Sequence, residues 1–313
     1  MAASAVVRDA VASGWPSRPV HLIVPFPQGQ AVDVIARIVA RRLAAIWNQD
    51  VVVQNHGGNS GIPAMVKGKS ATPDGYTLTV ASSGTLVINP ALFPDLPYRP
   101  LVDFVPVSNL FLVPLVIAGH PSFPASSFND FIAMVRREPG KLVYASPGQG
   151  STQHLTMELL KLRAGLDIAH VPYVGSAAAV NALVAGEVRV IMDTAVALMA
   201  TIGNSKAKPF AVTTARRALR PLDFIPPIAD TITGFDVAAW GGIAAPAKTP
   251  PEIVLKVAID VQAVLRETAV VRELGDNGTT PAGGTPAEFS AFIRKELEIW
   301  AQAVRATGTK PAN

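Results

Sequence analysis

The sequence predicts an α/β fold in two lobes, each a mostly parallel sheet flanked by helices. Short apolar runs alternate with segments of helical periodicity along the whole chain, which is typical of this class. The length of 313 residues is that of about two domains. Two further apolar stretches, at 104–118 and 236–245, divide the chain into a discontinuous first lobe, 15–110 and 236–313, and a second lobe, 111–235. This division predicts a hinged protein with a cleft between its lobes.

The first lobe opens with an apolar run, a loop and a long helical segment. From Val32 to Leu43, apolar residues recur at the spacing of one helix face, while arginines occupy other faces. Asp74-Gly75 is a turn signal before the last strand of this part. The strands expected here are 20–24, 51–54 and 76–81, and the helices are 31–47 and 62–67.

The second lobe repeats the alternation, and the chain then ends in helices. The stretch 104–118 predicts one or two buried strands, and 238–245 predicts a second crossing strand. Pro251 and Pro286 stand where helices would begin. The further strands expected are 142–145, 168–173, 188–192 and 210–213, and the helices are 127–137, 151–163, 177–184, 195–202, 251–267, 271–274 and 286–307.

The composition favours a soluble protein with sizeable cores. Hydrophobic residues make up 49% of the chain and charged residues 16%, yet no apolar run approaches the roughly 20 residues of a membrane helix. The net charge of +4 is spread along the chain and aromatic residues are only 6%. Nucleic-acid binders concentrate basic residues with aromatic residues on one face, so no nucleic acid is expected as a partner.

The reactive residue types argue against a metal site or a catalytic site. Cysteine is absent, which excludes disulfides, cysteine-ligated metals and thiol nucleophiles. The histidines His21, His56, His120, His154 and His170 include no pair at metal-ligand spacing. No Gly-x-Ser-x-Gly elbow is present. We therefore expect no metal, no cofactor and no catalytic residue.

The N-terminal stretch 1–14 does not have the pattern of an intact signal peptide. It is rich in alanine and valine, but Arg8 and Asp9 stand where an apolar core should be. From the residues alone, either a signal was replaced or the protein is cytoplasmic.

Two segments share one design, a buried strand followed by a Pro/Gly/Gln loop and a helix. Residues 24–31 read Val-Pro-Phe-Pro-Gln-Gly-Gln-Ala, and residues 144–151 read Tyr-Ala-Ser-Pro-Gly-Gln-Gly-Ser. The first turn of a helix has unpaired backbone N–H groups and the positive end of the helix dipole. Small loop residues let a ligand approach those groups. The two junctions therefore predict an anion cleft, one junction in each lobe.

The side chains of these loops refine the type of anion site. Neither loop contains lysine, arginine or histidine, so backbone N–H groups and the hydroxyls of Ser146, Ser151 and Thr152 are the expected donors. The second loop also approaches a dinucleotide fingerprint, but Gln153 stands where its third glycine is required. His154 lies in the first turn of the second helix and is either a packed residue or a ligand contact.

The sequence resembles the tripartite tricarboxylate transporter substrate-binding family, also called the Bug receptors of Bordetella and related bacteria. The matching residues extend from Trp15 to Lys310. They are Trp15-Pro16-Ser17-Arg18-Pro19-Val20, Ile23-Val24-Pro25-Phe26 with Gly29 and Asp33, Ala71-Thr72-Pro73-Asp74-Gly75-Tyr76-Thr77-Leu78, Asn89-Pro90-Ala91-Leu92-Phe93, Pro139-Gly140-Lys141-Leu142, Tyr144-Ala145-Ser146, Gly150-Ser151, His154, His170-Val171-Pro172-Tyr173 and Gly283-Gly284-Thr285-Pro286.

This resemblance implies a type II periplasmic-binding-protein fold and a receptor function. It implies a small organic acid as ligand: a dicarboxylate, a tricarboxylate, an amino acid or an aromatic acid. It also implies a periplasmic monomer that delivers the ligand to the integral membrane subunits of a permease. An α/β enzyme or a signalling sensor that uses the same anion cleft is the alternative.

The family's pattern, transferred position by position, implies a set of ligand-binding residues. The two loops, the end of the 76–81 strand, the loop after Tyr173 and a second-lobe aspartate contribute to it. The set is Pro25, Phe26, Gln28, Gly29, Gln30, Asp33, Ser82, Ser83, Ala145, Ser146, Gly148, Gln149, Gly150, Ser151, Thr152, His154, Tyr173, Gly175 and Asp193.

The chain departs from the family's pattern at two places near these residues. The family usually has Gly-Gly where this chain has Gly29-Gln30, so the Gln30 side chain either contacts the ligand or narrows the pocket. After Tyr173 the family commonly has Lys-Gly-Gly, whereas this chain has Val174-Gly175-Ser176. A positive charge near the mouth of the cleft is thereby lost.

Overall fold

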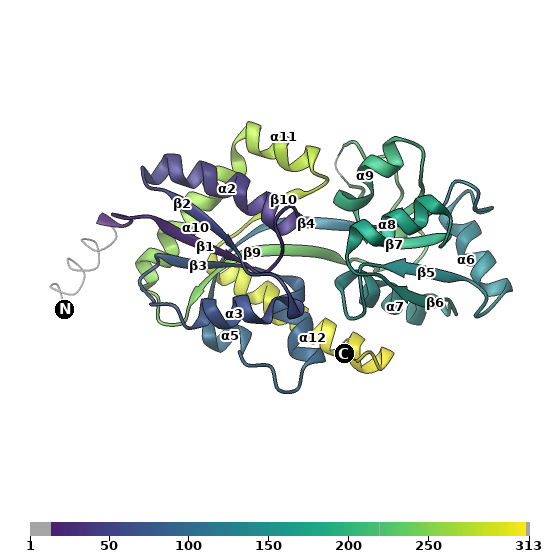
Figure 1. Ribbon diagram of the computed structural model, residues 1–313, viewed down its shortest axis with the longest axis horizontal. Helices are drawn as coiled ribbons and strands as arrows, with labels where there is room; N and C mark the ends of the chain where they lie inside the picture. Colours follow the sequence, from purple (N-terminus) through teal and green to yellow (C-terminus); the bar gives the residue numbers. More distant parts are fainter. Residues whose placement is uncertain (1–13, 219, 311–313) are drawn as a thin grey trace. The chain divides into compact units, whose positions relative to one another are not determined.

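The computed structural model describes residues 14–218 and 220–310, and the chain forms two compact units (Figure 1). Unit 1 comprises the chain up to Phe111 together with Trp240–Leu274 and Pro281–Trp300. Unit 2 comprises Leu112–Ala239, Gly275–Thr280 and the chain from Ala301. The sequence-based division had assigned everything after 236 to the first lobe. Apart from Gly14, the stretch considered for a signal peptide lies outside the described residues.

Unit 1 is built on a mixed sheet. Its strands include β1 (Val20–Val24), β2 (Val51–Asn55), β3 (Thr77–Ser82) and β9 (Ala238–Pro246), in the order β2-β1-β3-β9. β1 pairs in parallel with β2 and β3, while β9 pairs antiparallel to β3. The parallel pairing places the carboxyl ends of β1 and β3 at the same edge, where strand-to-helix connections begin.

The helices of unit 1 follow from the apolar pattern of the sequence. α2 (Ala31–Trp47) begins and ends where the periodicity predicted, buries Ile35, Val39 and Leu43, and is followed by Asn48 in the left-handed conformation. The other helices of this part are α3 (Ile62–Lys69), α4 (Asn89–Leu92), α5 (Pro100–Asp103) and α10 (Pro251–Arg266), and α11 (Thr268–Asp276) and α12 (Pro286–Thr307) extend from unit 1 into unit 2.

Unit 2 is also built on a mixed sheet, with the strand order β4-β7-β5-β6. Its strands are β4 (Phe104–Gly119), which begins in unit 1, β5 (Val143–Ser146), β6 (Ala169–Pro172), β7 (Val190–Thr194) and β8 (Lys208–Val212). β5 pairs in parallel with β6 and β7, whereas β4 pairs antiparallel to β7 and β8.

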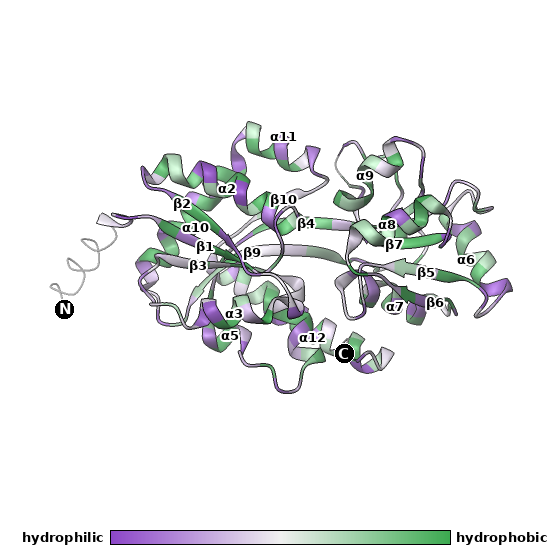
Figure 2. Ribbon diagram, viewed as in Figure 1, coloured by the Kyte–Doolittle hydropathy of each residue, from purple (hydrophilic) through white to green (hydrophobic). Residues whose placement is uncertain are grey.

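The inner strands of unit 2, β4, β5 and β7, are apolar on both sides because both sides are covered by helices (Figure 2). On one side, Leu115 and Ile117 of β4 pack in a core with α6 (Phe128–Arg137) and α7 (Thr152–Ala164). On the other side, Val116 and Ala118 pack in a core with α8 (Ser176–Ala185) and α9 (Ala195–Gly203).

Most expected elements are confirmed within a few residues, and several elements were missed. The stretch expected as one or two strands at 104–118 is one strand, β4. The short elements β10 (Thr280–Gly283), α4 and α5 were not predicted from the sequence. Nor did it predict the π-helical turn Gly84–Ile88, which takes the place of the loop expected at Ser82 to Thr85. These elements are short, so they have too few residues to show a period.

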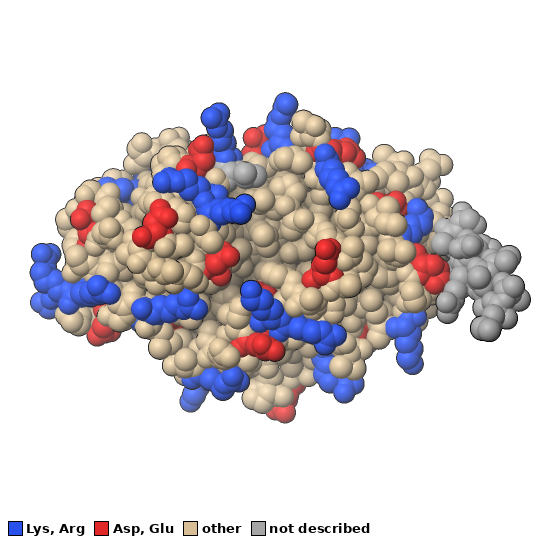
Figure 3. Space-filling view, turned by 180° about the vertical axis from the view of Figure 1, so that it is seen from behind, with Lys and Arg blue, Asp and Glu red and all other residues tan. Residues whose placement is uncertain are grey.

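The face drawn in Figure 3 has no single-sign patch of charge. Basic and acidic side chains are interspersed on the face drawn in Figure 3. Within residues 14–218 and 220–310, no helix combines the length and the apolar character that crossing a bilayer requires.

Candidate functional site

The first junction is the loop between β1 and α2, and the buried side chain of Asp33 holds it in place. Asp33 is the third residue of α2, and its Oδ2 accepts a hydrogen bond of 2.8 Å from the backbone N–H of Gly29. Arg37 Nε donates to both carboxylate oxygens at 3.0 Å, and Asn55 Nδ2 donates to Oδ1 at 2.8 Å. Burial acts to raise the pKa of Asp33, but these hydrogen bonds together hold it below its usual value.

The tip of the first junction is exposed. Gln28, Gly29 and Gln30 are all exposed, Gly29 has a φ of 86°, and the Gln30 side chain does not cap the helix. Pro25 is buried and Phe26 is half-buried, with its carbonyl accepting from Asn55 Nδ2 at 3.0 Å. The first turn of α2 therefore offers backbone N–H groups at a surface loop without basic residues.

Ser82 and Ser83 lie at the end of β3, next to the π-helical turn. Both are buried, and the hydroxyls of Ser82 and Thr85 are used locally. Ser82 N donates to Thr85 Oγ1 at 2.9 Å, and Thr85 N donates to Ser82 Oγ at 3.3 Å. The reciprocal bonds fix the turn that follows β3.

The second junction is the loop between β5 and α7, and it repeats the arrangement of the first. Ser151 caps α7 by accepting from the backbone N–H of His154 at 3.2 Å. His154 is the third residue of α7, and its Nδ1 accepts from the backbone N–H of Gly150 at 3.1 Å. In both junctions, therefore, the third helical residue binds the N–H two residues before the helix. The His154 side chain is buried and shapes the loop.

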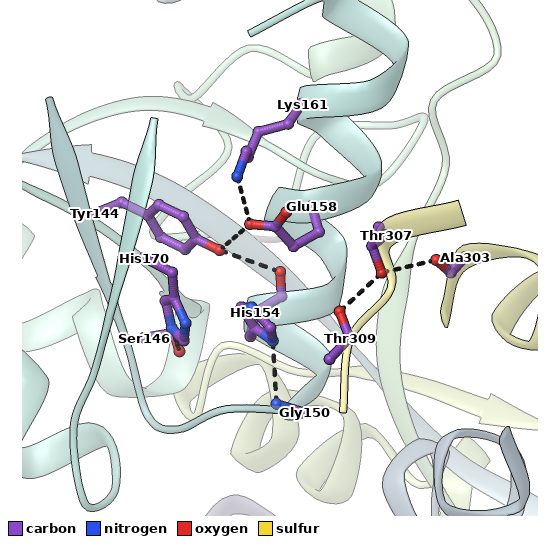
Figure 4. Close-up of polar contacts among 10 residues, drawn as sticks. All are labelled: Tyr144, Ser146, Gly150, His154, Glu158, Lys161, His170, Ala303, Thr307 and Thr309. Atoms are coloured by element: carbon purple, nitrogen blue, oxygen red, sulfur yellow. Dashed lines mark hydrogen bonds and ion pairs between the residues drawn. The ribbon is translucent and has the colours of Figure 1, made fainter. Parts of the chain in front are cut away.

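Behind the second loop lies a cluster of polar and aromatic side chains (Figure 4). The rings of His154 and His170 stack with centroids 4.0 Å apart, and Ser146 Oγ lies 2.7 Å from His170 Nε2. Glu158 accepts from Tyr144 at 2.9 Å and from Lys161 at 2.9 Å. The cluster comes from β5, β6 and α7.

Both histidines of this cluster are held in the neutral form. Burial lowers the pKa of His154, and Lys161 adds to that effect while Glu158 opposes it. Burial also lowers the pKa of His170 to about 3, and His154 and Lys161 lower it further. Neither ring therefore supplies a positive charge at neutral pH.

A pocket of about 410 Å³ lies beside this cluster in unit 2. One wall carries Gln149, His154, Glu158, Lys161 and His170, and the other is formed by 307–310 at the end of α12. Gln149 Nε2 donates to the carbonyl of Lys310 at 3.0 Å, so this predicted ligand contact is engaged with the C-terminal segment.

Asp193, at the end of β7, connects the first turns of three helices. Its Oδ1 accepts from Thr194 N at 2.7 Å, Ser176 Oγ at 3.0 Å and Gln153 Nε2 at 3.1 Å. Those donors belong to the starts of α9, α8 and α7. Its Oδ2 is buried and has no hydrogen-bond partner among the described residues. Burial raises the pKa of Asp193 to about 6, against these hydrogen bonds.

The loops after β5 and β6 are joined by backbone hydrogen bonds. Tyr173 N donates to the carbonyl of Ser146 at 3.0 Å, and Gly175 N donates to that of Pro147 at 2.9 Å. The side chain of Val174, between these two anchors, is 98% exposed.

The structure brings the predicted site residues together in two groups. Unit 1 holds Pro25 to Asp33 with Ser82 and Ser83, and unit 2 holds Ala145 to His154 with Tyr173, Gly175 and Asp193. Sequence reasoning missed His170 and Ser176 as partners of Ser146 and Asp193. No local spacing signals these contacts, because each joins residues far apart in the sequence: Ser146 of β5 with His170 of β6, and Ser176 of α8 with Asp193 of β7.

Comparison with known proteins identifies the family of the chain that carries these two junctions. Residues 35–309 match the tripartite tricarboxylate transporter family receptor. The chain belongs to this family. It is 34% identical to BugT of Bordetella pertussis over 99% of this chain and 95% of BugT. It is 35% identical to a UPF0065 protein from the tcbD-tcbE intergenic region of Pseudomonas sp. strain P51, over 93% of this chain and 86% of that protein.

Solved structures agree with this assignment to the receptor family. Rpa4515 of R. palustris, solved with adipate, has a TM-score of 0.86 and 34% identity, covering 95% of this chain and 100% of that one. MatC (Rpa3494) of Rhodopseudomonas palustris, solved with bound malate, has a TM-score of 0.80 and 30% identity over 93% of this chain and 100% of that one. The predicted family and the periplasmic-binding-protein fold class are therefore confirmed.

Proposed function

We propose that the protein is an extracytoplasmic receptor that captures a small carboxylate and delivers it to a tripartite tricarboxylate-type permease. The observation that carries the proposal is the shared construction of its two junctions. In each, a side chain from the first helical turn fixes the loop, and a helix N-terminus is presented. Such a site binds an anion through backbone N–H groups and the helix dipole.

The receptor family supports the same ligand class and location. Two relatives that share about a third of their residues with this chain were solved with adipate and with malate. A further relative at 35% identity is described as a periplasmic transporter. We infer a periplasmic location and a small organic acid as ligand, with the permease subunits as partners.

One contact favours an enzyme as the second candidate. Ser146 Oγ lies 2.7 Å from His170 Nε2, as a nucleophile lies beside its general base. However, Ser146 is fully buried, and a pKa near 3 makes His170 a weak base at neutral pH. The contact is better explained as a hydrogen bond that stabilises the loop after β5. Turnover of a bound carboxylate by the purified protein would revive the enzyme hypothesis.

Calorimetric titration with a panel of monocarboxylates and dicarboxylates tests the receptor function. We expect at least one of them to bind with a dissociation constant well below about 1 mM, the level of weak, unspecific association. Matched amides and amines of the same carbon skeletons serve as controls. The proposal fails if an amide or an amine binds while every carboxylate stays above that level.

Closure of the two lobes on one ligand stays a prediction. Small-angle scattering with and without a saturating ligand measures it directly, because closure reduces the radius of gyration. An unchanged radius with a ligand bound would contradict closure and leave carboxylate binding intact.

A further inference from the structure

The pocket beside the second junction is built from unit 2 alone. One side is a face of α7, where His154, Glu158 and Lys161 follow one another at helical spacing, and the other side is the chain from 307 to 310. Its volume of about 410 Å³ lies within the range of about 300–1,000 Å³ that small-molecule sites occupy. Residues 150–153, at the start of α7, do not line it. The pocket is therefore separate from the helix N-terminus.

His154 presents an unused hydrogen-bond donor to this pocket. Its Nδ1 accepts from the backbone N–H of Gly150 at 3.1 Å, so the proton of the neutral ring is on Nε2. Nε2 has no hydrogen-bond partner among residues 14–218 and 220–310, although only 7% of the residue is exposed. An acceptor that enters the pocket and bonds to this N–H is favoured, because little of the side chain is accessible to water.

The charged residues of the lining leave one cation without a partner. Lys161 and Glu158 form an ion pair at 2.9 Å. The ammonium of Lys310 has neither an ion pair nor a hydrogen bond within the part of the chain that the structure describes. Two lysines, one glutamate and two neutral histidines give the lining a net charge of +1. This balance favours one negative charge in the pocket and disfavours a second.

We propose that this pocket is a second binding site of the protein and takes a small monocarboxylate. The carboxylate accepts from His154 Nε2 and pairs with the ammonium of Lys310, while Glu158 repels a second anionic group. The site goes beyond the receptor function and does not depend on it, because it uses no N–H group of a first helical turn. His154 also holds the N–H of Gly150, so an occupant contacts the ring that shapes the second junction.

Benzoate and benzamide form a matched pair of probes, which differ in the negative charge. The chain has five histidines, so a sample labelled with ¹⁵N in its histidine rings gives few signals in NMR. The His154 signal is assigned as the one that His154→Gln removes. At pH 7.5 benzoate should shift the Nε2–H signal of His154 to saturation, and benzamide should not reach saturation over the same range. A signal that benzoate leaves unchanged, or that benzamide shifts equally, overturns the inference, whatever binds elsewhere on the chain.

Lys310→Gln and Glu158→Gln test the charges of the pocket and should act in opposite directions. Lys310→Gln should raise the dissociation constant of benzoate, read from the His154 signal, by about threefold, and Glu158→Gln should lower it by a similar factor. Lys206→Gln is the control, because Lys206 is exposed in the turn between α9 and β8 and does not line the pocket. Equal constants in wild type and both pocket variants, or the same change with the control, would overturn the site. Thermal unfolding verifies that each variant folds.

Discussion

The two junctions share a backbone design, yet each lies beside a buried aspartate in an opposite electrostatic state. Asp33 at the first junction bonds to Arg37, Asn55 and Gly29, and its pKa is lowered even though burial alone would raise it. Asp193 at the second junction has only neutral donors, and burial raises its pKa to about 6. The difference is one cation. It shows that a buried carboxylate stays ionised only where a charged donor compensates its loss of water.

Removing the compensated aspartate is expected to have the largest effect on stability. Asp33→Ala leaves the N–H of Gly29 and the Asn55 amide without their acceptor and should lower the free energy of unfolding by about 2 kcal/mol. The Arg37 side chain is 42% exposed, so loss of the ion pair itself adds little. Chemical denaturation measures the change. Asp50→Ala, at an exposed turn before β2, is the control. Equal losses in both variants would contradict the role of Asp33.

Neutralising Asp193, which has no charged partner, is expected to raise the free energy of unfolding rather than lower it. The folded chain holds the Asp193 proton more tightly than the unfolded chain does, since the pKa is about 6 rather than 3.8. Stability should therefore fall as the pH rises from about 4 to 6 and stay level above. Asp193→Asn keeps an acceptor for Thr194, Ser176 and Gln153, so it should remove this slope. At pH 8 it should raise the free energy of unfolding by about 1 kcal/mol, because the variant no longer buries a charge, while the new amide N–H, which lacks a partner, offsets part of that gain. A variant that is less stable at pH 8 would show that ionised Asp193 is stabilised.

The two aspartates also show which features of the junctions could be predicted from the sequence and which could not. The strand–loop–helix units, α2 with its bounds, and both loops could be predicted, because apolar period and Pro/Gly signals are local. The sequence indicated one partner of the Asp33 carboxylate, because Arg37 follows one helical turn later. It did not indicate the partners of the Asp193 carboxylate, because the donors Gln153 and Ser176 come from other parts of the chain. Burial and long-range pairing set a pKa, and neither has a local sequence signal.

The histidine stack should make the second junction sensitive to acid. The folded pKa of His170, about 3, lies below its usual 6.5, so its contribution to stability is present above pH 6.5 and is lost as the pH falls towards 3. Halved for its partial exposure, the loss between pH 7 and 5 is about 1 kcal/mol. It opposes the gain expected from Asp193. His170→Gln should reduce the acid loss, whereas His120→Gln, directly after the end of β4 and bonded to Ser122, should not. An identical acid profile in wild type and His170→Gln would contradict the assignment.

The smallest expected effects separate the two glutamines of the junctions. Gln30 has an exposed side chain that does not cap α2, whereas the Gln149 amide donates to the carbonyl of Lys310 at 3.0 Å. Gln30→Ala should therefore leave amide hydrogen exchange unchanged and alter ligand affinity by a few fold, about 0.5–1 kcal/mol. Gln149→Ala should speed exchange in 307–310, with a stability change within about 0.5 kcal/mol.

Hydrogen exchange followed by mass spectrometry, with calorimetry on the same samples, checks both glutamine variants. If Gln149→Ala changes affinity without faster exchange in 307–310, then Gln149 contacts the ligand and its hydrogen bond to Lys310 does not order that segment. If Gln30→Ala leaves affinity unchanged, the departure from Gly-Gly at the first junction has no part in ligand choice. Selection would then fall to the second junction.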